Sequence, residues 1–148
     1  MRRFMVLFAV LLLLVVPGAP VAVAGPPEAA TIASHMTFNN PPEVPNTGSF
    51  EATGSSLVCG SGTVVDLDYV FGTGQTLVRK EFTCADGSGS FYVKLDVRPT
   101  GDETESFTWV IQGGTGDYES LRGHGTGSSV RDENGGGITN SYEGFVNR

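Results

Sequence analysis

Glycine and proline divide this chain into short segments, and this division restricts the possible folds more than any other feature of the sequence. The 148 residues include 21 glycines and 8 prolines. The segments between them are rich in β-branched and aromatic residues and lack long helical periods. The clearest segment, 91–98, alternates apolar and polar residues without a break, as a strand with one buried and one solvated face requires. The sequence therefore predicts an all-β fold.

We expect eight strands, each bounded by residues that favour turns. They are Thr31–Phe38, Ser49–Thr53, Thr63–Phe71, Gln75–Cys84, Phe91–Arg98, Glu105–Gln112, His124–Val130 and Ile138–Val146. Glycine, aspartate and asparagine in the connections tolerate the positive φ of tight hairpins, so neighbouring strands should be antiparallel. Acidic residues precede a basic one in 117–122, which favours a short helical turn there. An antiparallel, up-and-down eight-stranded barrel fits best, and a two-sheet sandwich is the alternative.

The N-terminal segment has the features of a secretory signal peptide. Arg2 and Arg3 precede an unbroken apolar run over 4–16, and small residues occupy Ala22 and Ala24. We expect residues 1–24 to be removed by cleavage between Ala24 and Gly25, leaving a flexible arm over 25–30 and one barrel domain over 31–148. The run is too short for a typical membrane-spanning helix, which needs roughly 20 residues, although an uncleaved anchor is the alternative. No membrane insertion of the mature chain is expected, and it should be secreted.

The charge of the chain restricts its partners. The formal net charge is −7, and loss of Arg2 and Arg3 with the signal peptide would take it to −9. Nucleic acids and anionic membrane surfaces are bound by clustered lysine and arginine, which replace counterions. We therefore expect no nucleic-acid partner, and interpret the negative charge as a contribution to solubility.

Cys59 and Cys84 are the only cysteines in the sequence. A single pair in a small exported domain most often forms a disulfide. Cys59 follows the second expected strand and Cys84 ends the fourth, so both should lie at the same end of the barrel. The redox-active alternative lacks the usual C-x-x-C spacing.

The expected strands also predict what faces the barrel interior. Two apolar faces, one including Phe91 and the other including Phe107 and Trp109, could line a pocket or form an ordinary packed core. Lys80 shares a strand face with apolar residues, so its ammonium should point inward unless a bulge or a snorkelling stem redirects it. Asp66 should face solvent, or else be the partner of a basic residue. Glu143 is a weaker candidate for an interior polar group.

No motif for metal-dependent or hydrolytic chemistry is present. The sequence has only two histidines, and no spacing suggests a zinc site. The G-x-S-x-G pattern of serine hydrolases is absent as well. We expect no catalytic residue from these classes, no metal and no cofactor.

One motif resembles a known family. The stretch Val110-Ile111-Gln112-Gly113-Gly114-Thr115-Gly116-Asp117-Tyr118, with Leu121-Arg122-Gly123 after it, resembles the V-x-G-G-T-G-x-F/Y and downstream R-G of dirigent proteins and allene oxide cyclases. The wider run from Phe50 to this motif looks like a group of small secreted bacterial proteins that share the barrel. The resemblance implies an eight-stranded barrel, with Gly113, Gly114, Thr115, Gly116, Tyr118, Arg122 and Gly123 in a structural role. It also implies a cavity that encloses a reactive small molecule. No catalytic or binding residue of those families is assigned to this chain outside the motif.

Three hypotheses for function follow from these observations. The leading one is a secreted, non-enzymatic barrel that binds a small apolar ligand or an extracellular partner. Its candidate ligand-binding residues are Lys80, Phe91, Phe107, Trp109 and Glu143. The second is a cavity-type isomerase or cyclase acting on a hydrophobic substrate, which would require Lys80 or Glu143 inside an open pocket. The third is a filled barrel with a structural or interaction role, which would have no interior cavity.

Overall fold

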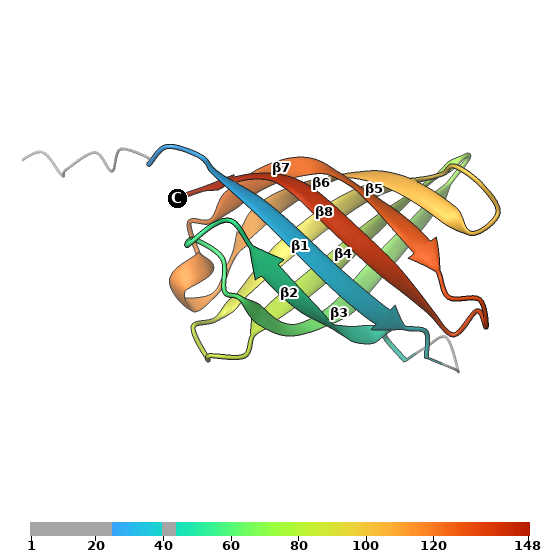
Figure 1. Cartoon of the computed structure of the whole chain (residues 1–148), viewed down its shortest axis with the longest axis horizontal. Coiled ribbons are helices and arrows are strands. Elements are labelled where there is room, and N and C mark those ends of the chain that lie inside the picture. Colours follow the sequence, from blue (N-terminus) through green and yellow to red (C-terminus); the bar gives the residue numbers. More distant parts are fainter. Residues whose placement is uncertain (1–24, 40–43) are drawn as a thin grey trace, which may run out of the picture.

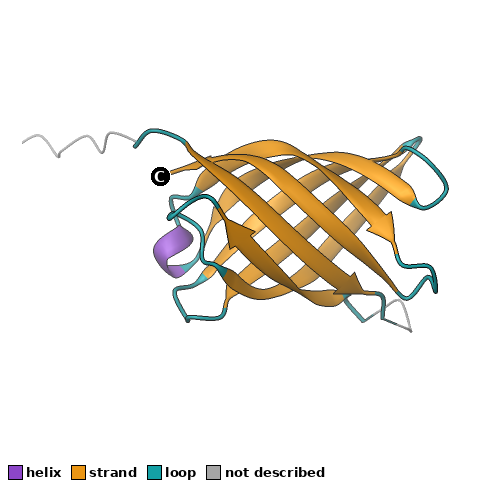
Figure 2. Ribbon diagram, in the orientation of Figure 1, coloured by secondary structure: helices purple, strands orange, loops and turns teal. Residues whose placement is uncertain are grey.

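The computed structural model describes residues 25–39 and 44–148, and these form a closed, antiparallel β-barrel (Figure 1). Its strands are β1 (Glu28–Thr37), β2 (Thr47–Thr53), β3 (Ser61–Gly72), β4 (Gln75–Cys84), β5 (Ser90–Pro99), β6 (Thr104–Gly114), β7 (Arg122–Arg131) and β8 (Gly137–Asn147), with one 3₁₀ turn, η1 (Gly116–Tyr118). Each strand pairs with its neighbours in the sequence, and β1 closes the barrel against β8. The secondary structure is almost entirely strand (Figure 2).

The eight-stranded up-and-down barrel confirms the fold predicted from the sequence, and the sandwich alternative is wrong. Every predicted strand is present, with ends within three residues of those expected. The expected arm over 25–30 needs a correction, because β1 begins at Glu28 and pairs there with Val146. Strand pairing with β8 thus begins at Glu28, before the predicted strand start at Thr31. The expected signal peptide, 1–24, lies outside the described residues.

Large aromatic side chains fill the half of the barrel nearest to η1. Phe82 and Phe91 stack with ring centroids 5.1 Å apart, and Phe50 packs edge-on against both. Tyr142 contacts this group from β8, with its ring centroid 5.9 Å from that of Phe82. All four residues are buried. This half of the interior is therefore a packed core.

Glycines on the inward face of β7 make room for the largest rings. A β-carbon at Gly125 would lie 2.7 Å from the Trp109 indole, and one at Gly127 would lie 2.3 Å from the Phe107 ring. Since real β-carbons do not approach other atoms so closely, the missing side chains on β7 are what allows β6 to place two large rings inside the barrel. The Trp109 Nε1–H donates to the Thr126 carbonyl oxygen at 3.1 Å, so its polar atom is satisfied.

The two ends of the barrel are built differently. The β6–β7 connection, which carries η1, folds over one end (Figure 1). Tyr118 and Leu121 of this connection are buried. At this same end, as predicted, a disulfide joins Cys59, in the β2–β3 connection, to Cys84, the last residue of β4. We call this end, with η1 and the disulfide, the closed end. The opposite end, formed by the β1–β2, β3–β4, β5–β6 and β7–β8 connections, is called the open end.

The helical segment is shorter than the predicted span of 117–122, because η1 covers only Gly116–Tyr118. Arg122 already belongs to β7, and its guanidinium donates to the Leu121 carbonyl oxygen at 2.7 Å. The cation thus satisfies a carbonyl at the end of the connection, in keeping with its predicted position. In the described part of the chain, no helix has the length and apolar character needed to cross a membrane.

Candidate functional site

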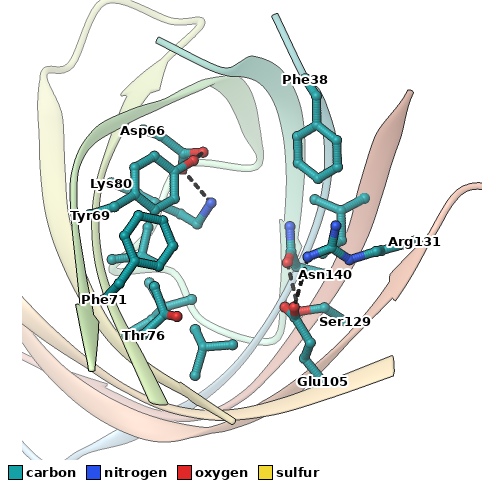
Figure 3. Close-up of a pocket in the computed structure, with 14 residues that line it drawn as sticks. Phe38, Asp66, Tyr69, Phe71, Thr76, Lys80, Glu105, Ser129, Arg131 and Asn140 are labelled. Atoms are coloured by element: carbon teal, nitrogen blue, oxygen red, sulfur yellow. Dashed lines mark hydrogen bonds and ion pairs between the residues drawn. The ribbon is translucent and has the colours of Figure 1, made fainter. Parts of the chain in front are cut away.

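A cavity of about 130 Å³ opens at the open end of the barrel (Figure 3). Apolar side chains from β4, β5 and β8 form part of its wall, namely Val78, Leu95, Val97 and Ile138. Polar and aromatic side chains form the rest. An engineered apolar cavity of about 150 Å³ is large enough to hold benzene, so the volume here corresponds to roughly one six-membered ring.

A β-bulge in β3 decides which side chains of that strand reach the cavity. Asp66 pairs with Lys80, and Asp68 pairs with Arg79, so Leu67 is an extra residue with no partner on β4. The bulge shifts the alternation by one residue. Asp66 before the bulge and Tyr69 and Phe71 after it therefore all line the cavity. The prediction that Asp66 faces solvent is wrong, because strict alternation was extended through this bulge.

Lys80 and Asp66 form a buried ion pair at the inner part of the cavity. The Lys80 Nζ lies 2.5 Å from the Asp66 Oδ1, and the two side chains are only 6% and 3% exposed. The other oxygen of Asp66 accepts hydrogen bonds from the Asn46 amide and the Tyr69 hydroxyl. The carboxylate is thus fully engaged, as a buried charge requires. The alternative anticipated from the sequence, that Asp66 is the partner of a basic residue, is confirmed.

Tyr69 is held as a neutral phenol. Burial raises its pKa above the ordinary value, and the hydrogen bond to the adjacent Asp66 carboxylate, with its negative charge, raises it further. The Asn46 amide also donates to the phenol oxygen, at 2.6 Å. Both the proton and one lone pair of the hydroxyl are therefore committed to the protein, which leaves the ring as the part of Tyr69 that is available to a ligand.

A second polar group stands on the opposite side of the cavity. The Ser129 hydroxyl donates to the Asn140 side-chain oxygen at 2.9 Å, and the Asn140 amide donates to the Ser34 hydroxyl at 3.1 Å. All three residues are buried. Nearer to the mouth, the Arg131 guanidinium pairs with Glu105 at 3.1 Å. Both charged groups that line this side are therefore paired with each other.

Aromatic rings surround the mouth. The rings of Tyr69 and Phe71 are stacked, with centroids 6.0 Å apart and planes 6° from parallel. Phe38 and Arg131 face them across the opening (Figure 3). Phe71 is 80% exposed, although it faces the cavity. The mouth therefore presents a large apolar ring face to solvent.

The five ligand-binding candidates chosen from the sequence have different positions in the structure. Lys80 points into the cavity, and β4 carries it there by unbroken alternation with Val78 and Phe82. Phe91, Phe107 and Trp109 are buried but lie outside the cavity lining, since they pack in the core.

Glu143, the fifth candidate, is exposed on the outer face of β8, so the proposed interior position is wrong. Its neighbours on the inner face are Asn140, Tyr142 and Val146. Asn140 is the polar residue that β8 does bring to the cavity. Glu143 shares its face with Phe145, and that face points to solvent, where Phe145 is 51% exposed.

The glycine motif lies at the closed end, on the far side of the barrel from the cavity. Gly113 and Gly116 have positive φ values of 92° and 57°. Thr115 binds Ser90 on β5, since its hydroxyl accepts from the Ser90 amide at 3.0 Å. Tyr118 is buried, and its hydroxyl lies 2.9 Å from that of Ser88.

The remaining motif residues, Gly114 and Gly123, allow close strand contacts. A β-carbon at Gly114 would lie 1.9 Å from the Ser90 carbonyl oxygen, and one at Gly123 would lie 2.9 Å from that of Phe145. The motif therefore builds the closed end and contributes nothing to the cavity.

Several cavity residues were not predicted. Asn140 shares an inward strand face with Ile138 and Tyr142, and the alternation that selected Lys80 would also have selected it. Ser129 shares its inward face with Gly125 and Gly127, which give no apolar signal. Phe38 and Arg131 lie at strand ends, where alternation gives a weaker signal. Tyr69 and Phe71 depend on the bulge.

The fold and the site together define a closed eight-stranded barrel with a small, partly polar cavity at one end. Comparisons with protein-family models, with curated proteins and with solved structures gave no match to this chain. Within residues 25–39 and 44–148, no cluster of three or more histidine, cysteine or carboxylate side chains could hold a metal ion.

Proposed function

We propose that this protein is an exported barrel that binds a small molecule in the cavity at its open end. The observation that carries the proposal is the contrast inside a single barrel, where one half is packed with aromatic rings and the other half retains a cavity with a buried charged pair. Buried polar groups that converge on an apolar pocket are typical of ligand sites. Export rests on the N-terminal sequence, and the disulfide fits an oxidising compartment.

A pair of matched substitutions tests the site. Val97 is a buried cavity residue of β5, whereas Val110 is exposed on the outer face of β6. We expect Val97→Phe to fill the cavity and abolish retention of a small molecule in native mass spectra of the protein secreted by an expressing host. Val110→Phe adds the same atoms outside the barrel and should leave retention unchanged.

Two outcomes of this experiment would contradict the proposal. A wild-type protein that carries no small molecule from any of several growth media would argue for a barrel that acts through its outer surface. Equal retention by both variants would place the bound molecule elsewhere. The same spectra test export, since cleavage between Ala24 and Gly25 predicts a mature chain that begins at Gly25.

A catalytic role is the second candidate, and the position of Lys80 favours it. An isomerase or cyclase that works by enclosing a hydrophobic substrate would need a polar group inside an open pocket, and Lys80 has this position. Asp66 lies beside it but already accepts three hydrogen bonds. A turnover assay on the retained molecule tests this role, and full activity in Lys80→Met would exclude it.

The resemblance to dirigent proteins and allene oxide cyclases supports the same proposal. The eight-stranded barrel is the fold that this resemblance implies, and the glycine motif occupies a structural position. We infer that this chain shares with those families a barrel that encloses a small molecule, and we assign none of their reactions to it.

A further inference from the structure

Lys80 has hydrogen-bonding capacity that the protein does not use. An ammonium carries three N–H donors. In the described part of the chain, Asp66 is its one hydrogen-bond partner. The side chain is 6% exposed, and its nitrogen points into the cavity (Figure 3). Because a buried donor without an acceptor is costly, an acceptor atom in the cavity would be strongly favoured.

The charges around Lys80 argue against an ionised ligand. Its charge is already balanced by Asp66, and the second pair that lines the cavity, Arg131 with Glu105, is balanced as well. An anion beside Lys80 would place two negative charges around one buried ammonium, in a chain whose net charge is −7. A cation would be repelled by Lys80 itself. An uncharged oxygen acceptor avoids both costs.

The walls specify the remainder of the ligand. The cavity of about 130 Å³ holds roughly one ring, and Val78, Leu95, Val97 and Ile138 form an apolar part of its wall. At the mouth, the stacked rings of Tyr69 and Phe71 offer a flat surface on which a second planar group could stack. A planar, unsaturated ligand would cover the exposed Phe71 ring as it entered.

Building on the proposed binding function, we infer that the ligand is an uncharged planar ring compound whose carbonyl oxygen accepts a hydrogen bond from the Lys80 ammonium. The ring lies between the apolar wall and Tyr69. Asp66 holds the ammonium in place and does not contact the ligand.

Four probes of similar size test this inference, and their affinities for the purified protein can be measured by calorimetry or by NMR titration. They are acetophenone, with an uncharged carbonyl; benzoate, an anion; benzylammonium, a cation; and toluene, which has no acceptor. We expect acetophenone to bind at least about tenfold more tightly than toluene, because a hydrogen bond to a charged donor is worth that much. Benzoate and benzylammonium should bind no more tightly than toluene.

A double variant connects the preference to Lys80. In Lys80→Met/Asp66→Asn both charges are removed together, and we expect acetophenone and toluene to bind with affinities within about threefold of each other. The matched control is Arg79→Met/Asp68→Asn, which makes the same changes in the adjacent exposed pair. It should keep the full preference. If the first double variant does not fold, the order of the four probe affinities for the wild-type protein still tests the inferred ligand class.

The outcomes separate this inference from the proposed function. Tightest binding by benzoate, or equal binding by toluene and acetophenone, would overturn the ligand class while leaving the cavity as a binding site. Persistence of the carbonyl preference in Lys80→Met/Asp66→Asn would overturn the role of Lys80. Failure of all four probes to bind the wild-type protein would overturn the inferred ligand class, whereas the proposed function is overturned only by native mass spectra in which the wild-type protein retains no small molecule.

Discussion

The two ends of this barrel share the same strands and differ in what their side chains do. At the closed end, Phe82, Phe91 and Leu121 are fully buried, and the disulfide joins the β2–β3 connection to the last residue of β4. At the open end, Phe71 is 80% exposed, and the interior holds the Lys80–Asp66 pair. The closed end therefore contributes most of the packing that stabilises the fold. The open end contributes an apolar surface that a ligand can cover.

This difference shows how a small barrel accommodates a polar cavity. A buried ion pair contributes little net stability and is strongly destabilising when broken. Such a pair is tolerated where packing elsewhere maintains the fold. The aromatic core at the closed end has this role, and the cavity can then be shaped for binding.

The strongest test compares two phenylalanines, one from each region. Phe82→Ala removes a fully buried ring and should lower the free energy of unfolding by about 3–5 kcal/mol. Phe71→Ala removes an exposed ring and should lower it by less than about 0.5 kcal/mol, while weakening ligand binding. Urea unfolding measures both effects. Equal losses of stability in the two variants would contradict the division of roles.

The second test compares two ion pairs that lie next to each other on β3 and β4. Lys80→Met leaves Asp66 buried without its cation, and should lower the free energy of unfolding by about 3 kcal/mol. Arg79→Met disrupts the exposed pair with Asp68 and should cost less than about 1 kcal/mol. Adding Asp66→Asn to Lys80→Met should recover most of the loss. Without such recovery, the cost would come from packing of the lysine stem rather than from the unpaired charge.

Two glycines with positive φ, one at each end of the barrel, extend the comparison of the two ends to the backbone. Gly116, at the closed end, has φ +57°, and a β-carbon there would lie 2.3 Å from the Ser88 carbonyl oxygen. Gly74, in the β3–β4 turn at the open end, has φ +74° with open space around it. Conformational strain alone costs roughly 1–2 kcal/mol for alanine in this region.

We expect Gly74→Ala to lower the free energy of unfolding by about that amount. Gly116→Ala should cost more, because the strain is added to a backbone clash. Thermal or urea unfolding compares the two variants. If Gly116→Ala were no more destabilising than Gly74→Ala, the tight contact between η1 and the β4–β5 connection would be unimportant for stability.

The fold could be predicted because its signals are local. Alternation of apolar and polar residues marks each strand, and turn-forming residues mark each hairpin. Because each strand pairs with the next strand along the chain, the order of strands in the sheet follows the order in the sequence. The inward position of Lys80 followed from the same alternation, since β4 contains no bulge.

The site could be predicted only in part, because it depends on contacts between strands. The bulge at Leu67 is a property of the pairing between β3 and β4, and the sequence alternates smoothly through it. Alternation therefore placed Asp66 on the wrong face. To predict the position of the cavity, one would also have to know which interior aromatic rings pack in the core and which line the cavity. The glycines of β7 accept Phe107 and Trp109 in the core, which moves those rings out of the predicted pocket.

The smallest expected effect concerns Tyr142, whose ring lies in the core and whose hydroxyl is buried with no hydrogen-bond partner among the described residues. Burial raises its pKa above the ordinary value of 10.0. The folded state therefore keeps the phenol proton at a pH where the unfolded chain loses it. The contribution of Tyr142 to stability is complete below pH 10 and declines as the pH rises above it.

We expect this decline to approach about 1.4 kcal/mol per pH unit, and to be absent in Tyr142→Phe. Urea unfolding at pH 9, 10 and 11 measures it as the difference between the wild-type protein and this variant. Tyr69→Phe, at the open end, should also flatten the alkaline decline, because burial and the neighbouring Asp66 carboxylate raise the pKa of Tyr69 as well. If the alkaline decline were the same in the wild-type protein and in Tyr142→Phe, the phenol of Tyr142 would lose its proton as readily in the folded as in the unfolded state, and the packed half of the barrel would have to be smaller than the aromatic contacts indicate.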